Sequence, residues 1–227
     1  MRASRSFEST ISSNSCFSSI PMFRLAAMVS VSLAASSPRT AAIIASEIPV
    51  FPLVASMMVA PVTANLETTV VACNTPLEIT SGVKVSRGII LVPILRAGLG
   101  FLDGFLDLIP QASVAHIGLA RNEKTLLAES YYLNHPPNLE EDEIIILDPM
   151  LATGGSAIEA VRRLREAGAR HVRFACMVAA PEGVSALELA FPELVIYAAC
   201  LDRCLNSAGY ILPGLGDAGD RLFGTAR

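Results

Sequence analysis

The length and the charge of the chain exclude several classes of protein. Its 227 residues can bury one substantial core, and this length does not require a second independent domain. The formal net charge of -4 provides no basic field of the kind that nucleic-acid binding needs, so an anionic ligand must be held by a local site. The 5 cysteines form no CxxC pair and no cluster at metal-ligand spacing, so the sequence predicts neither a disulfide framework nor a zinc centre.

The first 45 residues differ in composition from the rest of the chain. They are rich in serine, their basic residues are all arginines, and Glu8 is their only acid. This composition is typical of an organelle transit peptide, and a disordered leader or an incorrectly assigned start site is the alternative. We therefore expect a cytoplasmic protein, or a plastid or mitochondrial one if residues 1–45 are a transit peptide.

The segment from Ala41 to Val62 is apolar over a length that raises the possibility of a membrane helix. Glu47 and three prolines argue against a regular span, because each proline removes a backbone donor and kinks a helix. We expect a poorly regular segment that packs on the main domain or on a second subunit, and no membrane partner. The main domain is predicted at residues 46–227, with residues 46–74 as an atypical part.

From about residue 88, short runs of branched residues alternate with helical patterns. The expected strands are Gly88 to Pro93, Val114 to Leu119, Ile144 to Leu147, Val172 to Val178 and Val195 to Ala199. The expected crossover helices are Leu99 to Leu108, Ala157 to Ala167 and Val184 to Ala190. This alternation predicts an α/β fold in which a parallel sheet is flanked by helices. The charged and aromatic stretch from Arg121 to Glu143 has no such period, and it predicts a mobile flap above a site.

The strongest chemical signal is a strand end followed by a glycine-rich helix start. Ligands of open α/β sheets bind beyond the carboxyl ends of the strands, and Asp148 to Ser156 follows the predicted strand Ile144 to Leu147. Thr153 to Ser156 would surround one point with backbone N–H groups, hydroxyls and the positive end of a helix. This arrangement suits a phosphate monoester, and an ordinary turn with Ser156 as the N-cap is the alternative.

Ile144 to Ser156 (IIILDPMLATGGS) resembles the phosphoribosyl pyrophosphate motif of type I phosphoribosyltransferases, and its Asp-Pro form resembles the uracil phosphoribosyltransferase family in particular. The resemblance extends from about residue 75 to 227 and implies a binding site for phosphoribosyl pyrophosphate. The residues that it assigns to this site in the motif are Asp148, Pro149, Met150, Leu151, Ala152, Thr153, Gly154, Gly155 and Ser156. It also implies that Asp148 binds the ribose and takes part in catalysis.

Val92 to Gly100 (VPILRAGLG) is similar to the pyrophosphate loop of the family. Arg96 would offer forked donors to a diphosphate, while Ala97 and Gly98 would let backbone N–H groups come close. Arg121 matches a second arginine of the family on the expected flap, where closure would bring charge to the leaving diphosphate and exclude water. Arg96 and Arg121 are therefore expected to bind the substrate and to act in catalysis.

Gly209 to Gly224 (GYILPGLGDAGDRLFG) is rich in glycine and has no hydrophobic period, which favours a shaped loop over a regular element. By resemblance to the uracil enzymes, Ile211, Gly216, Asp217 and Ala218 bind uracil. Asp217 is also expected to contact phosphoribosyl pyrophosphate and to act in catalysis. Main-chain groups suit this task, because a pyrimidine is small, uncharged and has both donor and acceptor edges.

No metal site is predicted in the protein itself. Asp103, Asp107, Asp202 and Asp220 have no metal-ligand spacing and are interpreted as surface acids. The resemblance implies Mg²⁺ held mainly by the substrate diphosphate, a homo-oligomer, and GTP as an activator.

The implied reaction joins uracil to phosphoribosyl pyrophosphate and yields UMP and diphosphate, as in pyrimidine salvage. A catalytically silent paralogue is one alternative, because Arg24 to Asn65 lacks the charged residues and the tyrosine that the uracil enzymes usually carry there. This departure also puts the expected dimer contacts in doubt. A pyrimidine-responsive regulatory protein that binds RNA is the other alternative, and it would need a basic face.

Overall fold

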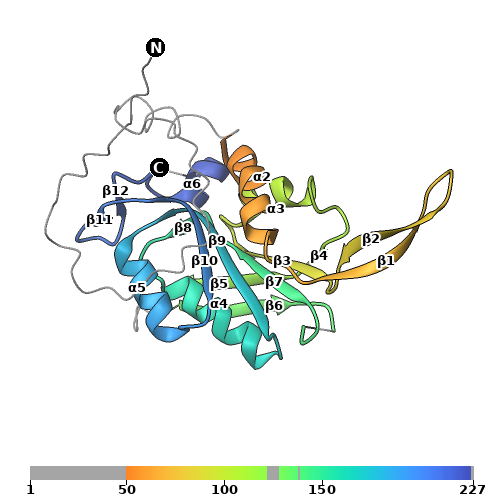
Figure 1. The fold of residues 1–227 in the computed structure, drawn as a ribbon. Coiled ribbons are helices and arrows are strands. Elements are labelled where there is room, and N and C mark those ends of the chain that lie inside the picture. The colour runs from red at the N-terminus through yellow and green to blue at the C-terminus, as the bar shows by residue number, and fades with distance from the viewer. Residues whose placement is uncertain (1–49, 122–127, 138, 226–227) are drawn as a thin grey trace, which may run out of the picture.

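The computed structural model describes residues 50–121, 128–137 and 139–225. Its centre is a sheet in the order β10-β9-β7-β3-β5-β6 (Figure 1). The bounds are β3 (Ile89–Leu95), β5 (His116–Arg121), β6 (Ala128–Asn134), β7 (Glu143–Leu147), β9 (His171–Ala179) and β10 (Val195–Leu201). The short strands β4 (Ser113–Val114) and β8 (Met150–Leu151) pair with β3 and β9. All pairs are parallel except β5 with β6, so the predicted parallel sheet is confirmed apart from one edge.

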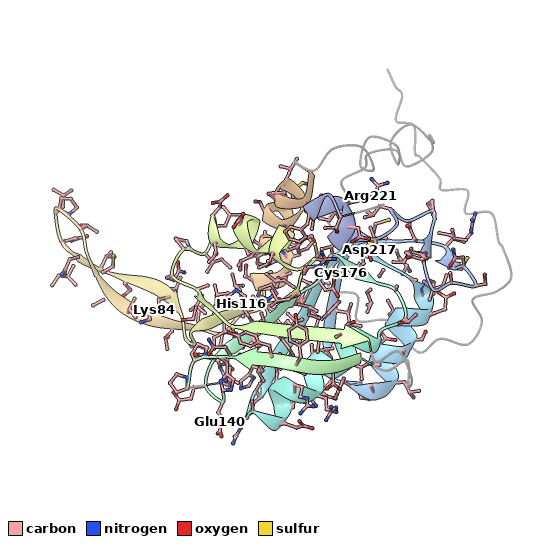
Figure 2. All side chains as sticks on the ribbon, turned by 180° about the vertical axis from the view of Figure 1, so that it is seen from behind. Lys84, His116, Glu140, Cys176, Asp217 and Arg221 are labelled. Carbon is pink, nitrogen blue, oxygen red and sulfur yellow. The ribbon has the colours of Figure 1, made fainter. Side chains whose placement is uncertain are left out.

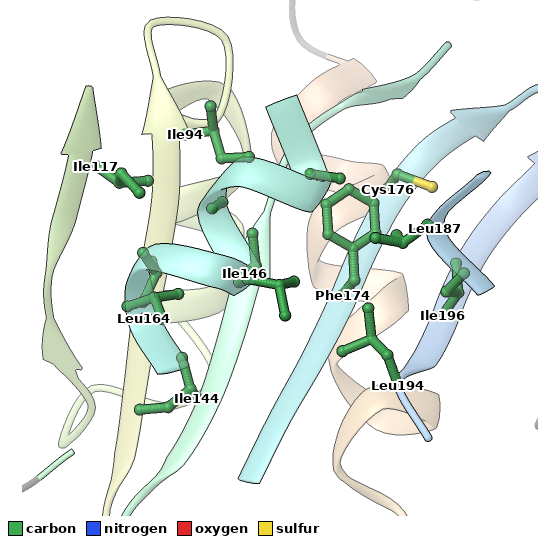
Figure 3. Close-up of a cluster of buried hydrophobic side chains, with 14 of the residues drawn as sticks. Ile94, Ile117, Ile144, Ile146, Leu164, Phe174, Cys176, Leu187, Leu194 and Ile196 are labelled. Carbon is green, nitrogen blue, oxygen red and sulfur yellow. The ribbon is translucent and has the colours of Figure 1, made fainter. Parts of the chain in front are cut away.

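Helices cover both faces of this sheet. One face carries α2 (Val50–Thr63) and α3 (Leu99–Leu106), and the other carries α4 (Gly155–Glu166) and α5 (Pro181–Ala190), as Figure 1 shows. Alternate residues of each strand supply the two cores. On β3, Ile90 packs in the core beneath α4 and α5, whereas Leu91 packs in the core beneath α2 and α3. Figure 3 shows the first core, in which Ile146 and Phe174 lie against Leu164 of α4 and Leu187 of α5. Burial on both faces explains the continuous branched runs of the central strands.

The apolar segment before residue 65 is more regular than its sequence predicts. Residues 41–49 lie outside the described part of the chain, but Val50–Thr63 is an uninterrupted helix, so the expectation of poor regularity is wrong. Pro52 lies in the first turn, where backbone N–H groups have no acceptor within the helix, so its missing N–H is tolerated. Pro61 lies in the last turn, so it disturbs few hydrogen bonds of the helix. The expected packing on the main domain is confirmed by buried Phe51, Ala55 and Val62. Among the described helices, none has the length and apolar character needed to cross a membrane.

The expected flap is only partly irregular. Residues 122–127 lie outside the described part, but Ala128–Asn134 forms strand β6, which pairs with β5 in an antiparallel hairpin. The Tyr131 ring lies over Gly118, where an added Cβ would come within 2.4 Å of it. This cross-strand contact stabilises the hairpin. Apolar periodicity in the sequence does not predict it. The stretch expected as a flap thus contains a regular strand, β6, that the sequence did not predict.

An arm extends from the body between α2 and β3. Strands β1 (Thr68–Asn74) and β2 (Ile79–Val85) pair with each other along their full length and with no other described strand. Figure 1 shows this hairpin standing away from the sheet, and Figure 2 shows Lys84 of the arm far from Asp217. Val70 and Val83 face each other across the two strands and are 74% and 72% exposed.

The C-terminal segment folds into short elements rather than one loop. Strands β11 (Cys204–Leu205) and β12 (Ile211–Leu212) pair in an antiparallel manner, and helix α6 (Ala218–Phe223) follows a cis peptide bond at Pro213. The expectation that Gly209 to Gly224 holds no regular element is therefore wrong at β12 and α6. Both elements are too short to give a periodic pattern.

We expect substitution of Gly104 to separate α2 from α3. An added Cβ would lie 2.4 Å from the carbonyl oxygen of Pro52 and 2.7 Å from the Cβ of Ala55, so Gly104→Ala should lower the free energy of unfolding by about 2 kcal/mol. Denaturant unfolding measures this loss. The control is Gly82→Ala on the arm, where the nearest atom would be 3.4 Å away and we expect a change below about 1 kcal/mol. Equal effects of the two substitutions would contradict the close helix contact.

Candidate active site

The parallel sheet brings two functional loops to one edge. Pro93 of β3 lies opposite Leu147 of β7, so the residues that follow these strands, Arg96 and Asp148, emerge side by side. The loop after β3 approaches β7 so closely that a Cβ on Gly98 would lie 2.4 Å from the carbonyl oxygen of Leu147. Glycine is therefore required at this position by packing against β7. The N–H of Gly98 donates to the carbonyl of Ile94 at 2.8 Å, so it is not the free donor that we expected.

The predicted phosphate cradle opens helix α4. Its N-cap is Gly154 in the left-handed conformation (φ 82°), and no side chain caps the helix. The alternative of an ordinary turn with Ser156 as the N-cap is therefore not what the structure has. The N–H groups of the first turn, together with the hydroxyls of Thr153 and Ser156, remain available to an anion. An added Cβ on Gly183 would lie 2.3 Å from the carbonyl oxygen of Ala152, so α5 braces the cradle from behind.

Asp148 lies where strand β7 ends. The carbonyl of Pro149 accepts hydrogen bonds from both Met177 and Val178 (3.1 and 3.0 Å), which breaks the regular pairing and turns the Asp148 side chain toward the site. The carboxylate accepts a hydrogen bond from the N–H of Met150 at 3.3 Å. Burial raises the pKa of Asp148 to about 7, the Met150 N–H opposes this rise, and the negative charge of Asp217 adds to it. Asp148 and Asp217, distant in sequence, thus interact electrostatically in one site.

These loops surround a cavity of about 410 Å³. Predicted site residues that line it are Asp148, Met150, Ala152, Thr153, Gly155, Ser156, Ile211, Gly216, Asp217 and Ala218. The cavity thus combines an anion-binding helix start with a wall of mostly small residues from the C-terminal segment.

Several predicted residues do not line the cavity. Leu151 and Pro149 are buried, and Gly154 faces Gly183 of α5. These residues therefore support the loop on the side away from the cavity. Arg96 stands outside the cavity at its rim, and the side chain of Arg121 lies outside the described residues. The backbone of Arg121 ends β5, opposite Ala128.

Other lining residues were not predicted from the sequence. They are Leu119, Ala120, Ala208, Gly209, Tyr210 and Gly219, whereas Ala97, which also lines the cavity, belongs to the predicted pyrophosphate loop. Leu119 and Ala120 lie near the carboxyl end of β5, so the rule that ligands bind beyond strand ends was the available signal. Ala208 and Gly209 gave no signal in the sequence, because small side chains next to a shaped loop carry little chemical information.

Carboxylates hold the C-terminal segment in place. Glu182 at the start of α5 accepts from the N–H of Leu205 at 2.9 Å, and Asp202 accepts from the N–H of Gly214 at 2.9 Å. Asp217 caps α6 by accepting from the N–H of Asp220 at 2.8 Å. The interpretation of Asp202 as a surface acid is therefore wrong, since it fixes the turn that precedes Gly216.

Arg96 is bound to the same segment. Its Nη2 donates to Asp220 at 3.2 Å and its Nη1 donates to Thr225 at 3.4 Å, while its Cζ lies 5.9 Å from the centroid of the Phe223 ring. Asp220 lies at the surface, as its interpretation as a surface acid predicts, and it is also a partner of a predicted catalytic residue.

The raised pKa of Asp148 predicts a pH-dependent stability. The folded protein holds this proton more tightly than the unfolded chain, so the contribution of Asp148 is complete below pH 3.8 and is lost as the pH rises through about 7. Asp148→Asn cannot ionise, and we expect it to raise the free energy of unfolding by about 2 kcal/mol at pH 8. Denaturant unfolding at pH 5 should show less than half of this gain. Asp107→Asn on the exposed end of α3 is the control, and a gain independent of pH would contradict the assignment.

Comparison with known proteins agrees with this geometry. The family model for uracil phosphoribosyltransferase matches residues 45–225. A uracil phosphoribosyltransferase of Bacillus velezensis is 53% identical over 173 residues, covering 76% of this chain and 83% of that protein. One from Polaromonas naphthalenivorans is 52% identical, covering 75% of this chain and 82% of that protein. A solved structure from Aquifex aeolicus is similar with a TM-score of 0.74 and 37% identity, covering 79% of this chain and 86% of that one. The chain belongs to the uracil phosphoribosyltransferase family.

Proposed function

We propose that the chain transfers the phosphoribosyl group of phosphoribosyl pyrophosphate to uracil and releases UMP and diphosphate. The observation that carries this proposal is that an uncapped helix start, two carboxylates and a glycine-rich wall meet in one cavity. Each of these parts suits one portion of the substrates: the phosphate, the ribose and the base. Membership in the family supports the choice of uracil.

We assign the roles from the family resemblance, and for the residues that line the cavity their position supports the assignment. Thr153 to Ser156 anchor the 5′-phosphate, Asp148 binds the ribose, and Ile211, Gly216 and Ala218 contact uracil. Arg96 and Arg121 neutralise the diphosphate as the bond from the anomeric carbon to its oxygen breaks. The new bond joins the anomeric carbon to N1 of uracil, and the N1 proton leaves on the released diphosphate. Asp217 lines the cavity beside Gly216 and Ala218, and we propose that its charge stabilises the positive charge that develops on the sugar.

Mg²⁺ fits this site as a companion of the substrate. Asp148 and Asp217 line the same cavity, and Mg²⁺ is commonly bound by one or two carboxylates together with substrate phosphates. In the described part of the chain, no group of three or more His, Cys, Asp or Glu side chains is placed to hold a metal by itself. Bound Mg²⁺ would neutralise charge on the diphosphate, so we propose that the diphosphate supplies most of its ligands.

Diphosphate release with uracil, Mg²⁺ and phosphoribosyl pyrophosphate tests the activity. We expect turnover with uracil and at least a hundredfold lower rate with cytosine, because the exocyclic amine changes the donor and acceptor pattern of the base. Binding of phosphoribosyl pyrophosphate without turnover on any base would favour the silent paralogue. Turnover with another base and none with uracil would contradict the proposed specificity.

The cradle predicts a defect in a single serine variant. Ser156→Ala removes a hydroxyl donor from the phosphate site, and we expect the KM for phosphoribosyl pyrophosphate to rise about tenfold, as for loss of a hydrogen bond to a charged group. Ser185→Ala, on the exposed side of α5, is the matched control and should leave KM unchanged. An unchanged KM in Ser156→Ala would show that the phosphate binds elsewhere.

We also propose that the protein is a homo-oligomer, with a second copy covering two apolar surfaces. The arm pairs with no other strand in the part of the chain that the structure describes, and a lone two-stranded hairpin is marginally stable in water. Helix α2 has no charged residue and exposes Leu53 and Met57 one turn apart, at 63% and 43%. Helix α2 lies within Arg24 to Asn65, the region whose departure from the family puts the expected dimer contacts in doubt, and the arm follows it in the chain. Their apolar character supports association through packing rather than through charge.

An acidic residue on the arm should weaken this association. Val83→Asp places a charge on the exposed apolar pair with Val70, and we expect a penalty of about 3 kcal/mol, which corresponds to roughly hundredfold weaker association. Sedimentation equilibrium measures the change. Leu189→Asp on α5, a residue that is 86% exposed, is the control and should leave the oligomer intact. A wild-type chain that is monomeric at micromolar concentration would contradict the proposal.

Activation by GTP stays a prediction from family resemblance. A second cavity of about 540 Å³ lies at the opposite edge of the sheet, where Arg165, Arg170 and Arg173 line it. Each of these arginines pairs with a glutamate, so the cavity has no evident excess of unpaired positive charge. Addition of GTP to the diphosphate assay tests activation directly.

The proposed location also depends on residues outside the described part. We propose a cytoplasmic enzyme, or a plastid or mitochondrial one if residues 1–45 are removed as a transit peptide. The N-terminal mass of the protein isolated from its source cell distinguishes these cases.

A further inference from the structure

The contacts of Arg96 converge on the C-terminal helix α6. Asp220 accepts from the guanidinium at 3.2 Å, and the hydroxyl of Thr225 accepts from it at 3.4 Å. The same hydroxyl donates to Asp220 at 2.6 Å, so the three polar groups form a closed triangle. The Phe223 ring also contacts the guanidinium, which lies over the face of the ring. Arginine has many rotamers, and these contacts select one of them.

Helix α6 is itself fixed to the site. Asp217 caps its first turn, and Leu222 packs so closely against the start of α3 that a Cβ on Gly100 would lie 2.7 Å from the leucine side chain. Gly219, in the first turn, lines the cavity beside Ala97, the neighbour of Arg96. The carboxylate of Asp220 is therefore held at the rim of the cavity by both ends of its helix.

We propose that Asp220, with Thr225, is a positioning residue that holds Arg96 at the cavity rim for the diphosphate of phosphoribosyl pyrophosphate. A guanidinium has five N–H donors, and the hydrogen bonds to Asp220 and Thr225 occupy one edge of it. The opposite edge stays open for a forked contact with a diphosphate. This inference rests on the proposed function and goes beyond it, because it assigns a role to a residue that the family resemblance leaves unassigned.

The position of Asp220 explains why an acid lies near a site for anions. Its charge is opposite to that of Arg96 and adjacent to it, and both side chains are partly exposed, so solvent screens the repulsion between Asp220 and a bound diphosphate. For binding of the diphosphate, the gain from the fixed geometry of Arg96 is then larger than the loss from this repulsion. Asp220 acts through Arg96 and needs no contact with the substrate.

Binding of two ligands separates this role from a general effect on α6. Phosphoribosyl pyrophosphate contains the diphosphate, whereas UMP contains the same 5′-phosphate and ribose without it. With Mg²⁺ present, calorimetric titration of Asp220→Ala should show about fivefold weaker binding of phosphoribosyl pyrophosphate, the ratio typical of a well-oriented exposed ion pair. Binding of UMP should change less than about twofold, since Asp217 still caps the helix.

Three further variants complete the experiment. Asp220→Asn keeps a side-chain oxygen for Arg96 and should bind phosphoribosyl pyrophosphate between the wild type and Asp220→Ala. In an Arg96→Ala background, Asp220→Ala should add less than about twofold, because the interaction that it removes is already absent. Asp103→Asn on α3 removes an equal charge from an exposed position and should bind both ligands as the wild type does.

Each contrary result has a distinct meaning. Unchanged or tighter binding of phosphoribosyl pyrophosphate by Asp220→Ala overturns the positioning role. Equal weakening for both ligands also overturns it, because Asp220 would then only support the fold of α6. A wild-type chain that binds neither ligand overturns the proposed function itself.

Discussion

The whole site depends on the close approach of backbone segments at one edge of the parallel sheet. A side chain at Gly98 would collide with the carbonyl oxygen of Leu147, and one at Gly183 would collide with that of Ala152. These two contacts press the loop after β3 and the start of α5 against the loop that holds Asp148. Most of the residues that line the cavity have small side chains. Binding of a small, uncharged base and a sugar phosphate follows from such walls more readily than from a few large side chains.

Local electrostatics compensates for the acidic character of the chain. The net charge is -4, yet the cavity combines an uncapped helix start with an arginine at its rim. Asp148 and Asp217 supply negative charge within the cavity, and burial raises the pKa of Asp148 to about 7. Under the proposed function, the positive groups serve the phosphates and the negative groups serve the sugar. Asp148 and the start of α4 are separated by a few residues of one loop, and no average charge reveals this separation.

The sequence predicts the central strands and α4 well, because continuous branched runs and a strict apolar stripe have few other solutions. It also identifies the cradle, since glycines and hydroxyls at a strand end have a specific chemical meaning. It misses β6, α2 as a regular helix, and the short elements of the C-terminus, where tertiary contacts such as Tyr131 on Gly118 override weak local patterns. The pairing of Arg96 with Asp220 was also missed, because these residues are 124 positions apart and meet only in the fold.

The central claim is that one cavity holds both the sugar phosphate and the base. Hydrogen–deuterium exchange with and without UMP tests it directly, because UMP contains both portions in a single stable molecule. We predict slower exchange at Ala152 to Ala157 and at Ala208 to Gly219, with little change at the start of β9. Protection confined to Asn65 and His171 to Arg173, which line the opposite cavity, would contradict the claim.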